Sequence, residues 1–411
     1  MAPGAVETLP TPVEHVDVTK SLAKEIVVPI VEEAPVEASV ENKAETATNA
    51  PTEGPAAATP LWTHREPLKL AGALDEFKSF DVTPTIGREF PEANLVDWLN
   101  APNADALLRD LAITISQRGV VFFRNQTNLT NDLQKDLILR LGQLTGRPAT
   151  SSLHIHPILN SERDLGGEDP QISTISSVQQ NEYYGRVPIA DTISPKKQSR
   201  AAWHSDIAFE PVPADYTSLR LVQLPKTGGD TLWASGYDIY DSLSKPYQQF
   251  LETLSVTFHQ PGFAQVAERA GFKLYDKPRG APENVGKELK AIHPVVRTNP
   301  VTGWKSIFPV GGHVGHINGV TEDESKALLA WFQDLVYKNH DLQVRFKWQN
   351  ENDIAIWDNR SVFHTATFDF RGQGERFGNR VVGLGERPYF DPQSTSRREE
   401  LDIEYRHHYT G

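Results

Sequence analysis

The chain has 411 residues, a formal net charge of −13 at pH 7 and no cysteine. The lack of cysteine excludes disulfides, cysteine-ligated zinc, iron–sulfur clusters and thiol nucleophiles, so any metal must be held by histidines and carboxylates. The acidic balance argues against nucleic acid as a partner, and no apolar run approaches the ~18 residues of a membrane span. The N-terminus shows no secretory signal. We therefore expect a cytoplasmic protein that binds a small molecule. Whether it forms a homo-oligomer is left open by the sequence.

Residues 1–60 differ in composition from the rest of the chain. They hold ten acidic residues against three lysines, and no Phe, Tyr or Trp. Such a segment cannot bury enough apolar surface to offset the entropy lost on ordering. We predict a disordered acidic tail over 1–60 and one folded domain over 61–411.

Sequence periodicity predicts the elements of that domain. Helical patterns occur at 103–116, after Thr130, and after Thr321, which forms a capping box with Glu324. Strand patterns, rich in β-branched and aromatic residues, occur at 119–124, 216–224, 342–348 and 353–358. Short strands dominate the middle and the C-terminal third of the chain. This order predicts a mainly β fold with flanking helices, built on a double-stranded β-helix, or jelly roll.

The stretch 170–200 carries no clear pattern of its own. It is partly polar and ends in a basic cluster just before His204. Long loops beside a candidate site often serve as lids. We therefore expect 170–200 to be a lid loop.

His204 and Asp206, in the run AAWHSDIAF, are the first candidate metal ligands. Residues two apart in a strand point to the same face, so a strand at 201–209 would aim both side chains into one space. The pattern alone is weak evidence, because His15 and Asp17 repeat it in the tail. The alternative interpretation is a structural polar pair.

A third ligand should come from a distant neighbouring strand. His364 fits, because it follows the predicted strand 353–358 and a turn-like pair of residues and re-enters an apolar run. Two histidines and one carboxylate on one face of a metal are typical of Fe(II) oxygenases, which keep positions open for a cosubstrate and O2. A zinc hydrolase would normally use three protein ligands and one activated water.

A 2-oxo acid bound to such a metal needs a cation for its distal carboxylate. Arg376 and Arg380 follow His364 and fall on one face of a strand, about 13 Å apart at 3.3 Å per residue. One guanidinium could hold the cosubstrate and the other an anionic substrate, since arginine offers a bidentate fork.

With these residues in place, the sequence resembles the taurine/2-oxoglutarate dioxygenase family, including the fungal sulfonate dioxygenases. The similarity covers about residues 80–392 and is strongest in four ordered motifs, the last of them followed by His364: LHIHP (153–157), WHSD (203–206), PKTGGDTLWAS (225–235) and WQNENDIAIWDNR (348–360).

The resemblance implies a jelly roll whose iron is held by His204, Asp206 and His364. It implies that Thr231 and Arg376 bind the 2-oxoglutarate carboxylate, and that His156 and Arg380 grip the substrate's sulfonate. Fe(II), 2-oxoglutarate and O2 would then hydroxylate an organosulfonate carbon. The products would be sulfite and an aldehyde, with succinate and CO2.

Several positions depart from the bacterial taurine enzymes. Leu159 stands where they place a tyrosine, Arg200 where they have a polar amide, and His313 about where an aromatic residue lines the pocket. The spacing after His364 is one residue longer, which makes Arg371 an alternative to Arg376. We expect His313 and Arg200 to contact the substrate. The same chemistry on a sulfate ester, carboxylate or amino acid is an alternative, as is a non-enzymatic jelly roll.

Overall fold

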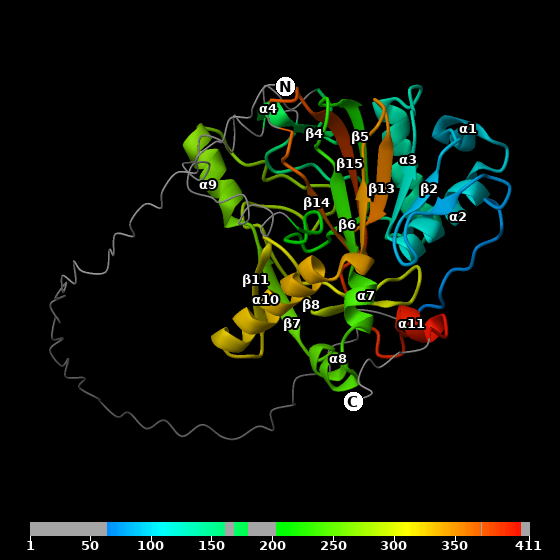
Figure 1. The fold of residues 1–411 in the computed structure, drawn as a ribbon. Coiled ribbons are helices and arrows are strands. Elements are labelled where there is room, and N and C mark those ends of the chain that lie inside the picture. Colours follow the sequence, from blue (N-terminus) through cyan, green and yellow to red (C-terminus); the bar gives the residue numbers. More distant parts are fainter. Residues whose placement is uncertain (1–63, 161–167, 180–202, 371, 404–411) are drawn as a thin grey trace, which may run out of the picture. The chain divides into compact units, whose positions relative to one another are not determined.

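Two β-sheets stacked face to face form the centre of the fold (Figure 1). The computed structural model describes residues 64–160, 168–179, 203–370 and 372–403, all within the unit that spans Thr59–Gly411. The predicted tail, Arg200 and Arg371 lie outside these residues. None of the helices in the described ranges has the length and apolar character that crossing a membrane requires.

The larger sheet has seven strands, with β2 and β3 parallel and all other neighbours antiparallel. In spatial order the strands are β1 (Phe80–Asp81), β2 (Arg88–Phe90), β3 (Val120–Phe123), β13 (Ile354–Asp358), β5 (Ala214–Gln223), β15 (Phe377–Leu384) and β4 (Ser173–Ser176).

A three-stranded antiparallel sheet faces it, in the order β12 (Gln343–Phe346), β6 (Thr231–Ser235) and β14 (Val362–Ala366). Aromatic side chains fill the space between the sheets. Trp233 of the small sheet lies 5.5 Å from Phe122 and 5.7 Å from Trp357, both from the large sheet, measured between ring centroids. Because side chains alternate along a strand, these residues mark the inner face of each sheet.

Helices α2 (Ala104–Arg118) and α3 (Asn131–Leu144) cover the other face of the large sheet (Figure 1). Val121 and Phe123 of β3 pack on them, while their neighbours Val120 and Phe122 face the small sheet. This alternation explains the uninterrupted apolar sequence of β3, since a strand buried on both faces has no polar side.

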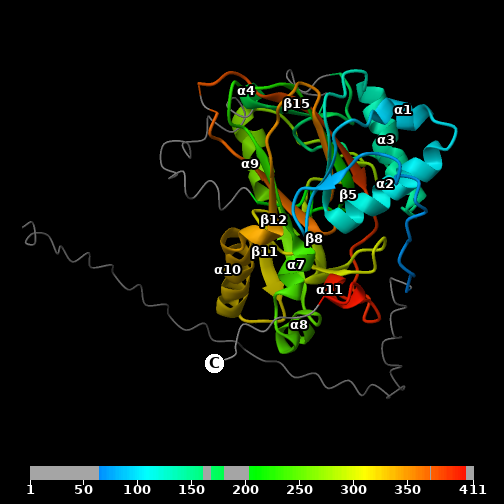
Figure 2. The same ribbon diagram turned by 45° about the vertical axis from the view of Figure 1, so that its right-hand side comes forward.

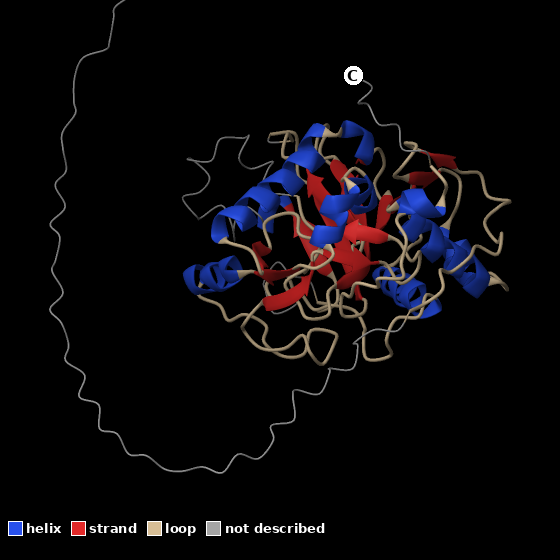
Figure 3. Cartoon of the chain, turned by 90° about the horizontal axis from the view of Figure 1, so that it is seen from below, coloured by secondary structure: helices blue, strands red, loops and turns tan. Residues whose placement is uncertain are grey.

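Several further strands and helices pack beside the outer face of the small sheet. A second three-stranded sheet has the order β11 (Val314–Asn318), β7 (Ser255–His259) and β8 (Lys290–Pro294), and β9 (Val296–Thr298) pairs with β10 (Lys305–Ile307). Helix α10 (Glu322–Lys338) packs on β11 and on α7 (Gly236–Asp241), as Figure 2 shows. The other helices are α1 (Leu95–Asn100), α4 (Ser177–Gln179), α8 (Lys245–Leu251), α9 (Pro261–Ala270) and α11 (Arg397–Glu400). Strands occupy the centre and helices flank them (Figure 3).

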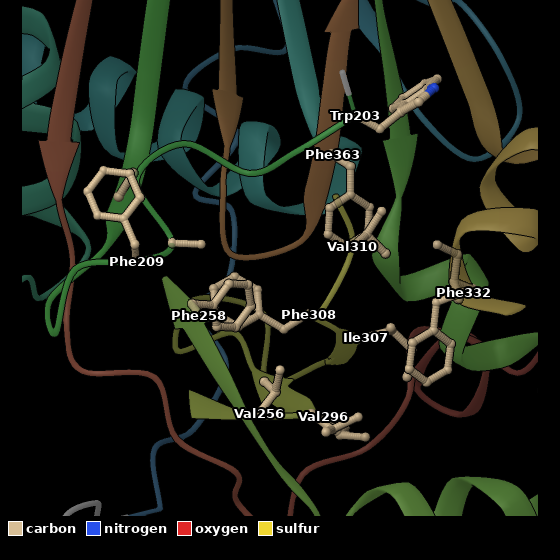
Figure 4. Close-up of a cluster of buried hydrophobic side chains, with 14 of the residues drawn as sticks. Trp203, Phe209, Val256, Phe258, Val296, Ile307, Phe308, Val310, Phe332 and Phe363 are labelled. Atoms are coloured by element: carbon tan, nitrogen blue, oxygen red, sulfur yellow. The ribbon is translucent and has the colours of Figure 1, made fainter. Parts of the chain in front are cut away.

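A large apolar cluster joins this region to the segment that carries His204 (Figure 4). Trp203, which precedes His204, and Phe363, which precedes His364, are both buried in it. Phe258 and Phe308 lie 5.1 Å apart lower in the same cluster. The apolar neighbours of the two histidines therefore anchor their backbones to the core.

Most of the predicted elements are confirmed. The helices after Thr130 and Thr321 begin as expected: each threonine side chain accepts a backbone N–H, and the second forms the full capping box with Glu324. The prediction of a loop over 170–200 is wrong for residues 173–176, because Ser173–Ser176 form edge strand β4, which pairs with β15. Residues 180–200 lie outside the described residues.

Candidate functional site

The two histidines of the predicted triad are joined through their backbones. The N–H of His204 donates to the carbonyl of His364 at 3.1 Å, and the N–H of His364 donates to the carbonyl of His204 at 2.8 Å. The pairing is an isolated bridge along β14, the outer strand at one edge of the small sheet. The strand or strand end expected at 201–209 is limited, in its described part, to the pairing of His204, since a turn begins at Asp206.

The turn that begins at Asp206 directs the carboxylate toward the histidines, as a strand would have done. Ile207 has a φ of 47°, a left-handed conformation that is costly for a β-branched residue and typical of a constrained functional segment. The N–H of Asp206 donates to Asn359 Oδ1 at 3.0 Å, which fixes the start of the turn. As a result, Asp206 points toward the histidines although it is not in a strand.

Side-chain nitrogen and oxygen atoms of His204, Asp206 and His364 converge within 4.8 Å of one another. Asp206 Oδ1 lies 3.9 Å from Nε2 of each histidine. Asp206 Oδ2 is buried and has no hydrogen-bond partner among the described residues. Two imidazole nitrogens and one carboxylate oxygen with spare acceptor capacity fit Fe(II), whose facial triad uses this donor set.

The electrostatics keep Asp206 and His364 ready to bind a cation. Burial raises the pKa of Asp206, but its cationic surroundings, the guanidinium of Arg380 first among them, outweigh the effect of burial, so the pKa is lowered and the carboxylate stays ionised. Burial lowers the pKa of His364 to about 3, which keeps its imidazole neutral. Metal ligands need these protonation states.

Gly311 lets a neighbouring loop approach the histidine segment. Its φ is +102°, and a Cβ at this position would lie 1.8 Å from the carbonyl oxygen of Trp203 and 3.0 Å from the Cα of His204. Only glycine fits such an approach. The loop that continues to His313 is thereby fixed against the site.

The predicted cosubstrate residues also lie together. Arg376 Nη2 donates to Thr231 Oγ1 at 3.4 Å, and its Nε donates to the carbonyl of Gly229 at 3.0 Å. Burial lowers the pKa of Arg376 to about 10, so the guanidinium remains charged at neutral pH. Thr231 shares the inner face of β6 with Trp233, which places the pair between the two sheets.

Arg380 lies on β15 beside the triad. Its Nη1 donates to Asp206 Oδ1 at 2.6 Å, and its Nε is buried without a partner among the described residues. Its neighbour His156 is buried, and burial together with the charge of Arg380 lowers the pKa of His156 well below its usual value. These two residues form a donor-rich wall next to the triad.

The ring of His156 has a defined tautomer. Its Nδ1 accepts the backbone N–H groups of Ile158 at 3.1 Å and Leu159 at 2.9 Å. A neutral ring that accepts at Nδ1 carries its hydrogen on Nε2. Nε2 of His156 is therefore a donor.

The neighbouring His154 plays a different part. Its Nε2 lies 3.2 Å from Glu210 Oε1, and Glu210 also accepts two hydrogen bonds from Arg279, with all three side chains buried. His154 therefore belongs to a buried polar network with Glu210 and Arg279.

His313 lies beside the triad, while Arg200 is outside the described residues. The His313 ring centroid is 5.5 Å from that of His204 and 5.2 Å from that of Phe209. Burial lowers the pKa of His313.

Three residues near the site were not predicted from the sequence. Trp348 Nε1 donates to Thr231 Oγ1 at 3.1 Å, Asn359 holds the N–H of Asp206, and Gln260 holds His313 at 2.8 Å. Trp348 and Asn359 lie inside one of the four motifs, which is a usable signal. Gln260 lies in no motif.

The comparisons with known proteins agree with this geometry. Residues 78–382 match the sequence model of the family described as Taurine catabolism dioxygenase TauD, TfdA family. The chain is 52% identical to the alpha-ketoglutarate-dependent dioxygenase btcD of Neocamarosporium betae, over 82% of this chain and 98% of that protein. It is 32% identical to the alpha-ketoglutarate-dependent sulfonate dioxygenase of Saccharomyces cerevisiae, over 77% of this chain and 69% of that protein.

A solved structure shares the fold. A taurine dioxygenase from Burkholderia xenovorans matches with a TM-score of 0.55 at 24% identity, over 77% of this chain and 92% of that chain. The fold and site thus define an alpha-ketoglutarate-dependent dioxygenase, an enzyme that uses Fe(II), 2-oxoglutarate and O2. The chain belongs to the TauD/TfdA family.

Proposed function

We propose that the enzyme hydroxylates an organosulfonate at the carbon next to sulfur. The C–S bond of the hydroxylated product then breaks. Sulfite leaves with the bonding electron pair, the hydroxyl proton is lost, and the carbon becomes an aldehyde. Succinate and CO2 are formed from 2-oxoglutarate. The observation that carries this proposal is the anion grip, Arg380 with the Nε2–H of His156, directly beside the triad.

The triad would hold the iron through His204, Asp206 and His364. When bound, Fe(II) supplies the activation of O2 that couples decarboxylation of 2-oxoglutarate to hydroxylation of a substrate C–H bond. Arg380 has a second task, since its hydrogen bond to Asp206 Oδ1 holds that carboxylate in place. Carboxylate ligands that are themselves hydrogen-bonded keep their orientation toward a metal.

Arg376 and Thr231 would bind the distal carboxylate of 2-oxoglutarate. Thr231 lies on the inner face of β6, and Arg376, one residue before β15 and only 4% exposed, donates to it, which supports this role. A charge-assisted hydrogen bond gains strength in such a dry environment. The cosubstrate's other end would then lie toward the triad.

A sulfonate offers three acceptor oxygens to the anion grip. Arg380 brings a forked cationic donor and His156 a neutral one, so both can bind the same group without repelling each other. The relative from Saccharomyces cerevisiae, named as a sulfonate dioxygenase, gives independent support.

The proposal extends to the architecture. The two facing sheets, with the site between them, support a jelly roll formed by one catalytic domain over 61–411, with a small anionic organic molecule as its partner. An alternative keeps the chemistry and changes the anion to a sulfate ester, carboxylate or amino acid, because an arginine fork also fits carboxylates.

A substrate screen tests the proposal. The full chain is incubated aerobically with Fe(II), 2-oxoglutarate and a panel of sulfonates, sulfate esters and carboxylates, and succinate and sulfite are measured in parallel. We expect sulfite and succinate in equal amounts with at least one sulfonate. Succinate that forms only with carboxylates or sulfate esters would overturn the sulfonate proposal and support the alternative.

A further inference from the structure

One hydrogen-bonding side chain beside the triad, His313, takes no part in the proposed function. His313 follows the close approach at Gly311, and its ring stands nearly perpendicular to that of His204, at 87°. Among residues that the structure describes, only its Nδ1 makes a side-chain hydrogen bond, and its Nε2 has no partner. His313 is itself partly exposed.

Gln260 fixes which nitrogen of His313 carries the hydrogen. Gln260 Oε1 accepts the backbone N–H of Gly262 at 3.1 Å, and a backbone N–H can only donate. The amide nitrogen of Gln260 must therefore be the atom that lies 2.8 Å from His313 Nδ1. Because an amide nitrogen also only donates, Nδ1 is the acceptor and the neutral ring carries its hydrogen on Nε2.

The backbone supports the same arrangement. Gln260 is the N-cap of helix α9, and the N–H of its neighbour His259 donates to the carbonyl of His313 at 2.9 Å. The side chain and the backbone thus join the start of α9 to the His313 loop. His313 is consequently held as a preoriented donor.

The two histidine donors both lie near the ring of Phe263. Phe263 of α9 is 5.2 Å from His156 and 6.5 Å from His313 between ring centroids. If the substrate's anion occupies Arg380 and His156, the donor of His313 remains for a second group. A site built to hydrogen-bond a substrate group rejects an analogue that lacks it.

We propose that His313, positioned by Gln260, determines specificity by donating from Nε2 to a second hydrogen-bond acceptor on the substrate. The substrate class is an organic anion that carries a hydroxyl, carbonyl or carboxylate group besides the one held by Arg380 and His156. An ammonium group at that end is rejected, because two donors would face each other. This inference rests on the proposed function and narrows its substrate class.

Matched substrates test it. For each chain length, kcat and KM are measured through succinate with alkanesulfonates that end in a hydroxyl, carboxylate, methyl or ammonium group. We expect the wild type to prefer the acceptor-bearing compounds over the methyl compound by about tenfold, mainly in KM, with the ammonium compound poorest. A wild type with no such preference overturns the proposal.

Variants test whether the substrate preference depends on His313 itself. His313→Phe is expected to bring the preference close to unity, His313→Gln to restore part of it through an amide donor, and Gln260→Leu to weaken it. His316→Phe, at an exposed histidine on β11, is the matched control and should retain the preference. If His313→Phe keeps the preference of the wild type, the proposal is wrong.

A measurement without turnover covers the case in which no sulfonate is a substrate. Nitrogen NMR of the metal-free protein with labelled histidine, assigned by comparison with His313→Gln, reports which ring nitrogen is protonated. We expect hydrogen on Nε2 in the wild type and a mixture in Gln260→Leu. Hydrogen on Nδ1 in the wild type overturns the inference, whereas a sulfonate screen without turnover overturns only the proposed function.

Discussion

Replacing Gly311 with alanine should damage both stability and the metal site. Two costs arise. The φ of +102° is unfavourable for any residue with a Cβ, at about 1 kcal/mol or more. The new Cβ would also lie 1.8 Å from the Trp203 carbonyl oxygen, where ordinary contacts begin at 3.4 Å. The segment that carries His204 must therefore retreat by more than an ångström.

Gly271→Ala is a matched control for the first cost. Gly271 has a φ of +75°, but no heavy atom lies within 4 Å of its ideal Cβ. We expect the free energy of unfolding to fall by about 1 kcal/mol in Gly271→Ala and by about 3–5 kcal/mol in Gly311→Ala. The difference between these two losses in the free energy of unfolding measures the cost of the contact with the Trp203 backbone.

Two assays measure the effect. Urea unfolding gives the free energy of unfolding of both variants, and titration with Mn(II) gives their metal affinity. Only Gly311→Ala should lose affinity, because only there does the His204 segment move. Equal losses of stability in the two variants, or unchanged Mn(II) affinity in Gly311→Ala, would refute this reasoning.

Three further predictions follow from single contacts. Trp348→Phe removes the donor to Thr231 and should raise the KM for 2-oxoglutarate by about two- to tenfold in steady-state assays; an unchanged KM would count against the role of Thr231. Arg376→Lys loses the fork and should raise the same KM by about tenfold or more, and a smaller effect than that of Trp348→Phe would contradict it. Burial lowers the pKa of His293 to about 3, so the unfolded chain binds this proton first and stability falls as the pH drops below 6.5. Urea unfolding from pH 7 to 5 should therefore show a mean slope shallower by about 1 kcal/mol per pH unit in His293→Gln; parallel slopes would refute it.

The elements with strong local patterns were predictable from the sequence. Helix α10 begins at its capping box, and β3 and β13 match their apolar runs, because these signals depend on residues close in the chain. Edge strand β4 was not predicted, since Ser173–Ser176 has little apolar character and pairs only because β15 is available. Its strand state comes from a tertiary contact.

The identity of the site residues was easier to predict from the sequence than their arrangement in space. The triad residues were named correctly as neighbours, yet Asp206 reaches the histidines through a turn fixed by Asn359, more than 150 positions away in the chain. Gln260 left no signal, because its importance arises only from its contact with His313, 53 residues further on. Local patterns cannot report such pairs.

The function of this enzyme depends on His204, Asp206 and His364 binding one metal ion together. Anaerobic titration with Mn(II), followed calorimetrically, tests it on the wild type, on the three single alanine variants and on the exposed control His316→Ala. The wild type and the control should each bind a single equivalent, and each triad variant should bind Mn(II) about tenfold or more weakly. Wild-type affinity in any of the three triad variants would contradict it.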